Sequence, residues 1–315
     1  MGVSLGMELK VKDMGIEAGG HFICIINEVD AKKLDLQLGD RLNLKHRSKS
    51  LVAIVDFADS ESTVPIGKLG LFEECFKYLG VKDGLVVQVS LAKRPVSIHY
   101  IKEKLEGKAL KKEQLQAIVY DIVNYNLTDI ELTYFVSACY SNGLNHQETV
   151  DLTRQMVEQG HKLKLNSTVL DKHCIGGVPN NRTTMIVVPI VTAAGLVMPK
   201  TSSRSISSPA GTADVMEVLA NVSLPADSLK KIVRKTKGFI AWGGGMNLAA
   251  ADDKLINVRH PLALDPPEMV LASVMAKKAS VSATHVLIDI PVGKTAKIKD
   301  AAAAKSMKRK FVKLG

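Results

Sequence analysis

Residues 167–221 decide the fold, and they read STVLDKHCIGGVPNNRTTMIVVPIVTAAGLVMPKTSSRSISSPAGTADVMEVLAN. Short apolar runs alternate here with polar loops and helical patterns, and the alternation continues downstream. Strands are predicted over 167–170, 197–200, 239–242 and 285–290. Helices are predicted over 181–195, 212–221 and 268–278. This order predicts a mainly parallel sheet with helices on its faces, and ligands bind such sheets in the loops at the carboxyl ends of the strands.

The region before this stretch divides into two further parts. Residues 1–93 are rich in Val, Ile and Leu, with strands expected over 21–27, 42–45, 51–57 and 84–91 and one helix near 71–79. This composition predicts a small β-rich, barrel-like N-terminal domain that ends at Arg94-Pro95. Residues 96–166 are expected to form a helical domain, joined by parts of 245–280. Residues 167–315 would then be the α/β domain, so the fold class is multi-domain α/β.

Sequence signals mark the ends of the expected helices. Thr128 and Glu131 form a capping-box pattern before one apolar run, and Asn145 opens another. Gly160 is expected to close that second helix in the left-handed conformation. A third helix is predicted over 111–125.

Charge and composition exclude several classes of protein. The formal net charge is +10, but residues 294–315 carry +7 of it, so the body of the chain is nearly balanced. Aromatic residues are only 4% of the chain, too few to favour a binder that stacks nucleic-acid bases. The four cysteines lie far apart and show no zinc or disulfide spacing, which favours a reducing cytoplasm. No secretory signal or membrane span is recognisable, so neither a membrane nor a nucleic acid is an expected partner.

Two loops have the composition of phosphate-binding loops. The first, residues 172–184, contains Gly176 and Gly177, whose backbone N–H groups can approach an anion at the start of a helix. Lys172 and Thr183 could add a charge and a hydroxyl. The second loop, residues 202–212, contains five serines, Arg204 and Thr212 before another helix. Taken alone, the first loop is also compatible with a plain structural turn and the second with a solvated, flexible loop that ends in an N-cap. Two such loops on neighbouring strands indicate a ligand with two anionic groups.

Three motifs carry a resemblance to a known family. The pattern Ser203-Arg204 followed by Gly211-Thr212-x-Asp214-x-x-Glu217 resembles the signature of the thymidine/pyrimidine nucleoside phosphorylases. The loop with Lys172-His173 and Gly176-Gly177, and the stretches 272–278 and 286–294, resemble further motifs of that family in the same order. The stretch 205–211, the sequence around Asp265 and the β-rich N-terminal domain resemble the archaeal AMP phosphorylases. The resemblance covers essentially all of 1–315, whereas members of the family continue further, so the α/β domain is expected to be incomplete at its C-terminal end.

The resemblance implies a reaction and a set of residues. AMP phosphorylases convert a nucleoside 5′-monophosphate and inorganic phosphate into the free base and ribose 1,5-bisphosphate, without a metal and with phosphate as co-substrate. Residues expected to bind AMP are Gly177, Ser203, Arg204, Ser205, Ile206, Ser207, Ser208, Thr212, Ser273 and Lys297. Phosphate contacts are expected from Lys172, His173, Thr183, Ser202, Lys277 and Lys294, of which Lys277 also faces the base or ribose and Lys294 is the alternative to Lys297. The family also implies a homodimer or a larger homo-oligomer.

Asp265 corresponds to the family's proton donor. A departing adenine needs a proton, and a carboxylic acid can supply it. Apolar neighbours, Leu264, Pro266 and Pro267, are expected to remove Asp265 from water. The alternative without the resemblance is an N-cap for the helix that contains Ser273.

Other interpretations stay open at this level. A pyrimidine nucleoside phosphorylase would share the motifs, and a shortened non-catalytic form could use its basic tail to contact RNA. A phosphoribosyltransferase is disfavoured because no acidic metal-binding residues are recognisable. Gly293-Lys294-Thr295 ends like a P-loop, but position 288 is Ile instead of Gly, so an ATPase is rejected.

Overall fold

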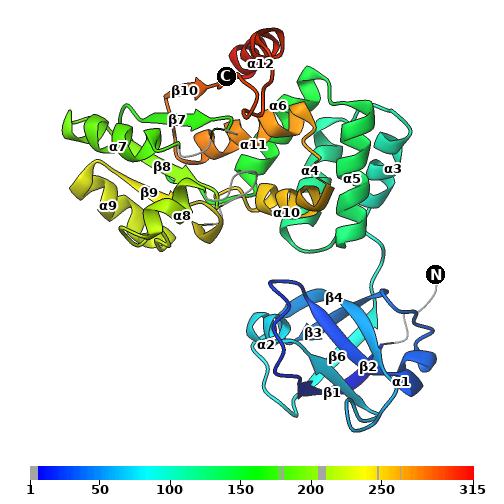
Figure 1. The fold of residues 1–315 in the computed structure, drawn as a ribbon. Helices are drawn as coiled ribbons and strands as arrows, with labels where there is room; N and C mark the ends of the chain where they lie inside the picture. Colours follow the sequence, from blue (N-terminus) through cyan, green and yellow to red (C-terminus); the bar gives the residue numbers. More distant parts are fainter. Residues whose placement is uncertain (1–5, 177, 179–180, 205–210, 247, 263) are drawn as a thin grey trace. The chain divides into compact units, whose positions relative to one another are not determined.

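A computed structural model describes residues 6–176, 178, 181–204, 211–246, 248–262 and 264–315 (Figure 1). The chain divides into two compact units, residues 1–96 and 97–315. Within the described residues, no helix is long and apolar enough to cross a membrane.

The first unit is a closed six-stranded barrel. Its strands are β1 (Met7–Asp13), β2 (Ile23–Asn27), β3 (Arg41–His46), β4 (Lys49–Ala58), β5 (Lys68–Leu71) and β6 (Val86–Leu91). The strand order is β1-β5-β2-β4-β3-β6, and β1 pairs with β6 to close the barrel. Alternate residues point inward, so Leu9, Val11, Leu42 and Leu44 are fully buried. Short helices α1 (Glu28–Lys33) and α2 (Glu73–Leu79) complete the unit. The barrel-like prediction is confirmed, although β1 and β5 were not predicted.

The second unit contains a helical bundle. Its first helices are α3 (Ser97–Leu105), α4 (Lys112–Val123), α5 (Asp129–Asn142) and α6 (His146–Glu158). Helices α10 (Ala250–Arg259) and α11 (Pro267–Ser280) pack against them and share their core, to which Leu255 and Met269 belong. Thr128 and Asn145 cap α5 and α6 as their sequence pattern predicts. The prediction for Gly160 is wrong, because the C-cap of α6 is Gln159 in a right-handed conformation and Gly160 does not have a positive φ. A glycine is needed at position 160 because a Cβ there would lie 2.6 Å from the Leu248 carbonyl oxygen.

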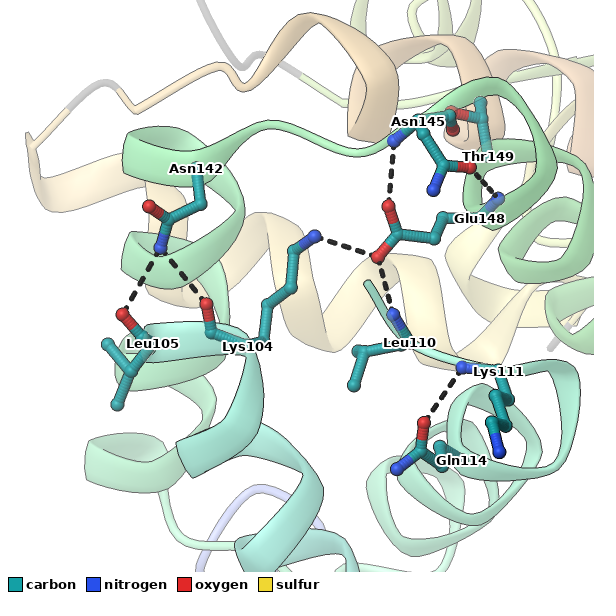
Figure 2. A network of polar contacts seen from close by, with 9 residues as sticks. All are labelled: Lys104, Leu105, Leu110, Lys111, Gln114, Asn142, Asn145, Glu148 and Thr149. Atoms are coloured by element: carbon teal, nitrogen blue, oxygen red, sulfur yellow. Dashed lines mark hydrogen bonds and ion pairs between the residues drawn. The ribbon is translucent and has the colours of Figure 1, made fainter. Parts of the chain in front are cut away.

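A buried ion pair fixes α6 to α3 (Figure 2). Lys104 Nζ lies 2.7 Å from Glu148 Oε1, and the backbone N–H of Leu110 donates to the same oxygen. The N–H of Asn145 donates to Glu148 Oε2. The buried carboxylate is therefore fully hydrogen-bonded, which is the condition for a buried charge to be tolerated. Because α11 packs on α6, this network also supports the helix that bears Ser273 and Lys277.

The remaining strands are parallel. They are β7 (Leu170–Cys174), β8 (Met198–Ser202), β9 (Gly238–Trp242) and β10 (His285–Asp289), and the helices beside them are α7 (Thr183–Ala193), α8 (Thr212–Glu217), α9 (Leu229–Thr236) and α12 (Ala301–Leu314). Short 3₁₀ turns occupy Ala226–Ser228, Gly244–Met246 and His260–Leu262. Strand β10 pairs with β7 and β8 pairs with β9, and a bridge between Val169 and Val197 joins the two pairs. The prediction of a mainly parallel α/β region is confirmed.

Candidate functional site

Three parallel strands end at one edge of the α/β region. Asp289 of β10 is in register with Cys174 of β7, and the bridge from Val169 to Val197 brings the end of β8 to the same side. The first strand lies later than predicted, over 170–174 instead of 167–170. Lys172 and His173 are therefore strand residues and do not belong to the loop, since Asp171 to Cys174 pair with Val286 to Asp289.

Lys172 and His173 lie in a strongly cationic environment. Lys172 is buried, and its Nζ lies 3.0 Å from Asp289 Oδ2. Burial lowers the pKa of His173 well below its usual value. Four nearby cations add to this effect, namely Lys278, Lys200, Lys277 and Lys172. The imidazole of His173 is therefore neutral near pH 7, and the surrounding positive charge is suited to an anion.

A turn after β10 brings Lys297 to Asp265. Lys297 Nζ lies 3.1 Å from Asp265 Oδ2, and the Lys297 backbone N–H donates to the carbonyl oxygen of Gly176 at 3.4 Å. Lys294, the alternative to Lys297, is exposed, and its carbonyl oxygen accepts a hydrogen bond from Lys299. The structure thus joins the first glycine loop, Lys297 and Asp265.

The surroundings of Asp265 differ from two expectations. Its side chain is 47% exposed, so the apolar residues beside it do not remove it from water. Asp265 is not an N-cap either, because the N-cap of α11 is Pro266 and it makes no side-chain cap. Only Pro266 among the three expected apolar neighbours is buried.

Asp252 organises the two expected site residues of α11. One oxygen of Asp252, Oδ2, accepts a hydrogen bond from the Ser273 hydroxyl at 2.8 Å and lies 2.7 Å from Lys277 Nζ. Asp252 is 1% exposed. Burial opposes the charge of Lys277, but Asp252 and Asp253 outweigh it and raise the lysine's pKa. Burial and the charge of Asp252 raise the pKa of Asp253 to about 6, against the opposing effect of Lys277.

Arg204 of the second loop contacts other side chains of the protein. Arg204 Nη1 lies 2.6 Å from Glu217 Oε2 and 3.1 Å from Asp214 Oδ1, and its guanidinium stacks over Trp242 at 4.8 Å. Arg204 is therefore engaged by two carboxylates and an aromatic ring, and its expected contact with the nucleotide stays a prediction. Gly211 permits this arrangement, because a Cβ there would lie 2.7 Å from the Ser203 carbonyl oxygen.

The other predicted residues occupy the loops and the helix starts. The Ser202 hydroxyl donates to the Ser203 carbonyl oxygen, and Thr212 is the first residue of α8. Thr183 is the exposed first residue of α7, and its N–H donates to Asn181 Oδ1. The side-chain amide of Asn181 in turn donates to Cys174 Sγ, which ties the loop to β7. The predicted residues outside the described part of the chain are Gly177, Ser205, Ile206, Ser207 and Ser208.

Arg259 is a buried cation that was not among the candidates. Its side chain is 6% exposed, and within the described residues its Nε and Nη1 have no hydrogen-bond partner. Its charge acts on Lys277, so it belongs to the same cluster. The sequence signal that could have identified Arg259 is its position shortly before Asp265. Asp252 and Lys200 were also missed, since no local pattern separates a buried charged residue from an exposed one.

Comparisons with known proteins agree with this architecture. Models of the Glycosyl transferase family match residues 98–160 (helical bundle domain) and 166–300 (a/b domain). AMP phosphorylase 1 of Archaeoglobus fulgidus is 46% identical over 297 residues, covering 94% of this chain and 58% of the relative. AMP phosphorylase of Methanococcus vannielii is 42% identical over 308 residues, covering 98% and 60%. The chain thus spans about three fifths of the length of these relatives. The structure of anthranilate phosphoribosyltransferase from Thermus thermophilus matches the fold with a TM-score of 0.56 at 17% identity, covering 68% of this chain and 63% of that one.

Proposed function

The chain belongs to the glycosyl transferase family whose helical bundle and a/b domains it contains, and on that premise we propose that it serves the phosphorolysis of AMP. The products are adenine and ribose 1,5-bisphosphate. The names of its relatives, the AMP phosphorylases that are 42–46% identical to it, support this substrate.

The proposed reaction exchanges two bonds at C1′ of the ribose. An oxygen of inorganic phosphate forms a bond to C1′ of the ribose while the bond from C1′ to the base nitrogen breaks. The electron pair of that bond stays on the base, which takes a proton from Asp265. For this step Asp265 must first have taken a proton from the solvent and have lost its contact with Lys297. The ribose carbon is oxocarbenium-like while these bonds exchange. The phosphate is the nucleophile, so cations that bind it also hold it in place for the attack on C1′.

One observation carries this proposal: Lys297 contacts both the Asp265 carboxylate and the backbone of Gly176 in the first glycine loop. The expected proton donor, the expected nucleotide-binding lysine and the expected phosphate loop thus lie within one short chain of contacts. A nucleotide phosphate that attracts the Lys297 ammonium would also draw it away from Asp265. Lys297 therefore links the binding of the nucleotide to proton donation by Asp265.

Assembly and location complete the proposal. We infer a homodimer or larger homo-oligomer, as the family resemblance implies. All four cysteines are free thiols, which suits a protein of the reducing cytoplasm.

The direct test is to incubate the folded chain with AMP and inorganic phosphate and to measure adenine by chromatography. Asp265→Asn should abolish adenine release, whereas Asp227→Asn, an exposed control in a 3₁₀ turn, should not. Faster cleavage of uridine or thymidine than of AMP would favour a pyrimidine nucleoside phosphorylase. Absence of cleavage of all three by the folded chain would contradict the proposal.

A further inference from the structure

Two carboxylates of α8 hold the Arg204 guanidinium. Glu217 binds it with both carboxylate oxygens, since Oε2 lies 2.6 Å from Nη1 and Oε1 lies 2.8 Å from Nη2. Asp214 Oδ1 lies 3.1 Å from the same Nη1. The two carboxylates are three positions apart and therefore lie on one face of the helix. A two-point contact of this kind fixes the direction of the guanidinium as well as its place.

Asp214 also fastens the far end of the second loop. Its other oxygen, Oδ2, accepts a hydrogen bond from the Gly211 backbone N–H at 2.8 Å. The backbone at Gly211 lies so close to Ser203 and Arg204 that a Cβ at position 211 would be 2.7 Å from the Ser203 carbonyl oxygen. The two ends of the loop therefore meet at one carboxylate. This contact sets the spacing between Ser203 and Thr212, the expected AMP contacts on either side.

Trp242 supports the same guanidinium at the end of β9. The Arg204 Cζ lies 4.8 Å from the centroid of the indole ring, a distance at which a cation is attracted to the ring. Gly244 packs against this ring, because a Cβ there would lie 2.9 Å from Trp242 Cε2. The backbone N–H of Gly243 donates to the Ser202 carbonyl oxygen, which joins β9 to the start of the loop. Arg204 thus connects the end of β9 with α8.

The charges around Arg204 argue against a direct contact between its guanidinium and a phosphate. One guanidinium and two carboxylates leave one negative charge in excess, and this excess repels a phosphate dianion. The hydrogen bond from Arg204 lowers the pKa of Glu217, so this carboxylate stays charged at neutral pH. A phosphate would have to displace Glu217 or Asp214 to reach the guanidinium.

We propose that Glu217 and Asp214 are positioning residues for the nucleotide, which act through Arg204. They hold the two ends of the loop so that Ser203 and Thr212 keep the spacing that binds AMP. The inference rests on the proposed function. The guanidinium then acts inside the protein, and the contact with AMP that is expected from residue 204 comes from its backbone. The side chains of Arg204 and Glu217 are 37% and 44% exposed, so water screens their charges and the ion pair adds little to stability.

The experiment measures the AMP affinity of the whole chain by calorimetry without phosphate, and the KM for AMP and for phosphate by steady-state kinetics. Glu217→Gln should weaken AMP binding and raise the KM for AMP by roughly tenfold, because an amide cannot bind the guanidinium through two oxygens. The kcat and the KM for phosphate should change by less than about twofold. A mere loss of folded protein would instead lower kcat and leave the KM for AMP unchanged.

Arg204→Lys separates positioning from a direct phosphate contact. Lysine keeps the charge but cannot make the two-point contact, so this variant should weaken AMP binding as much as Glu217→Gln does. The double variant should bind AMP no more weakly than either single variant, because the two residues act through one contact. If Arg204 left the carboxylates to bind the nucleotide phosphate, Glu217→Gln would free it and tighten AMP binding, and that result would overturn the inference.

Glu73→Gln is the matched control. Glu73 is 48% exposed and pairs with Lys77 at 2.9 Å on α2 of the barrel, so it belongs to an ion pair of similar exposure in the other unit of the chain. This variant should keep the AMP affinity and the KM values of the wild type. Unchanged AMP affinity in a folded Glu217→Gln chain that cleaves AMP would overturn the inference while leaving the proposed function intact. A wild-type chain that neither binds nor cleaves AMP would overturn both.

Discussion

The ammonium of Lys277 lies 2.7 Å from a carboxylate oxygen of Asp252 that is almost wholly removed from water. The same oxygen accepts the Ser273 hydroxyl, one helical turn earlier on α11. A single buried group of α10 therefore sets the direction of two side chains that are expected to face the nucleotide.

Asp252→Asn should reduce AMP cleavage by roughly 10- to 100-fold, because an amide oxygen orients Lys277 less strongly than a carboxylate does. Asp252→Ala should in addition lower the free energy of unfolding by about 3 kcal/mol, since it leaves the largely buried Lys277 ammonium without its ion-pair partner. Kinetics and urea unfolding of both variants check this. A fully active Asp252→Asn would show that the contact only stabilises the fold.

Asp253→Asn should stabilise the protein near neutral pH. The pKa of Asp253 is raised from 3.8 to about 6, so its effect on stability is most favourable below pH 4 and is lost as the pH rises through 6. Replacing the carboxyl should therefore raise the free energy of unfolding by up to about 3 kcal/mol at pH 7.5. Urea unfolding across this range should show the advantage shrinking toward pH 4. An advantage that does not vary with pH would rule out this cause.

Lys297→Met should raise the KM for AMP by about tenfold, because it removes the expected ammonium contact to the nucleotide. Lys294→Met is the comparison, since its side chain is exposed and the structure brings Lys297 to Asp265 instead. Steady-state kinetics of both variants measure the KM for AMP. A larger effect at Lys294 would reverse the assignment.

Lys104→Met should lower the free energy of unfolding by about 3 kcal/mol, because it leaves the buried Glu148 carboxylate without its cation. The double variant Lys104→Met, Glu148→Gln should recover much of that loss, since both charges are then absent. Thermal and urea unfolding of the two single variants and the double variant measure the coupling. Additive losses would mean that the two residues act independently.

Much of the fold was predictable from local patterns. The alternation of apolar runs and glycine-containing loops indicated the parallel strands, and capping boxes located the starts of α5 and α6. Strand β1 was missed although Met7–Asp13 alternates apolar and charged residues, because its charged positions made the segment read as mixed polar. Strand β5 has only four residues, too few for a pattern to stand out.

The site was less predictable, because its contacts join distant parts of the chain. Motif positions identified both Lys297 and its partner Asp265. They identified Lys172, Ser273 and Lys277 without their partners Asp289 and Asp252. Lys278 and Asp171 are 107 positions apart, and Ser273 and Asp252 are 21 apart. No periodicity in the sequence links such residues, since their proximity arises only when helices and strands pack.

The sequence by itself determined most of the element types, the order of the motifs and the presence of two loops with the composition of phosphate-binding loops. Tertiary structure alone decided which charges are neutralised and which are not. Arg204 is held by Asp214 and Glu217, whereas Lys200 has a backbone carbonyl for its partner. The physical reason is that desolvation and ion pairing depend on burial and on distance in space, and these are set by packing between elements remote in sequence.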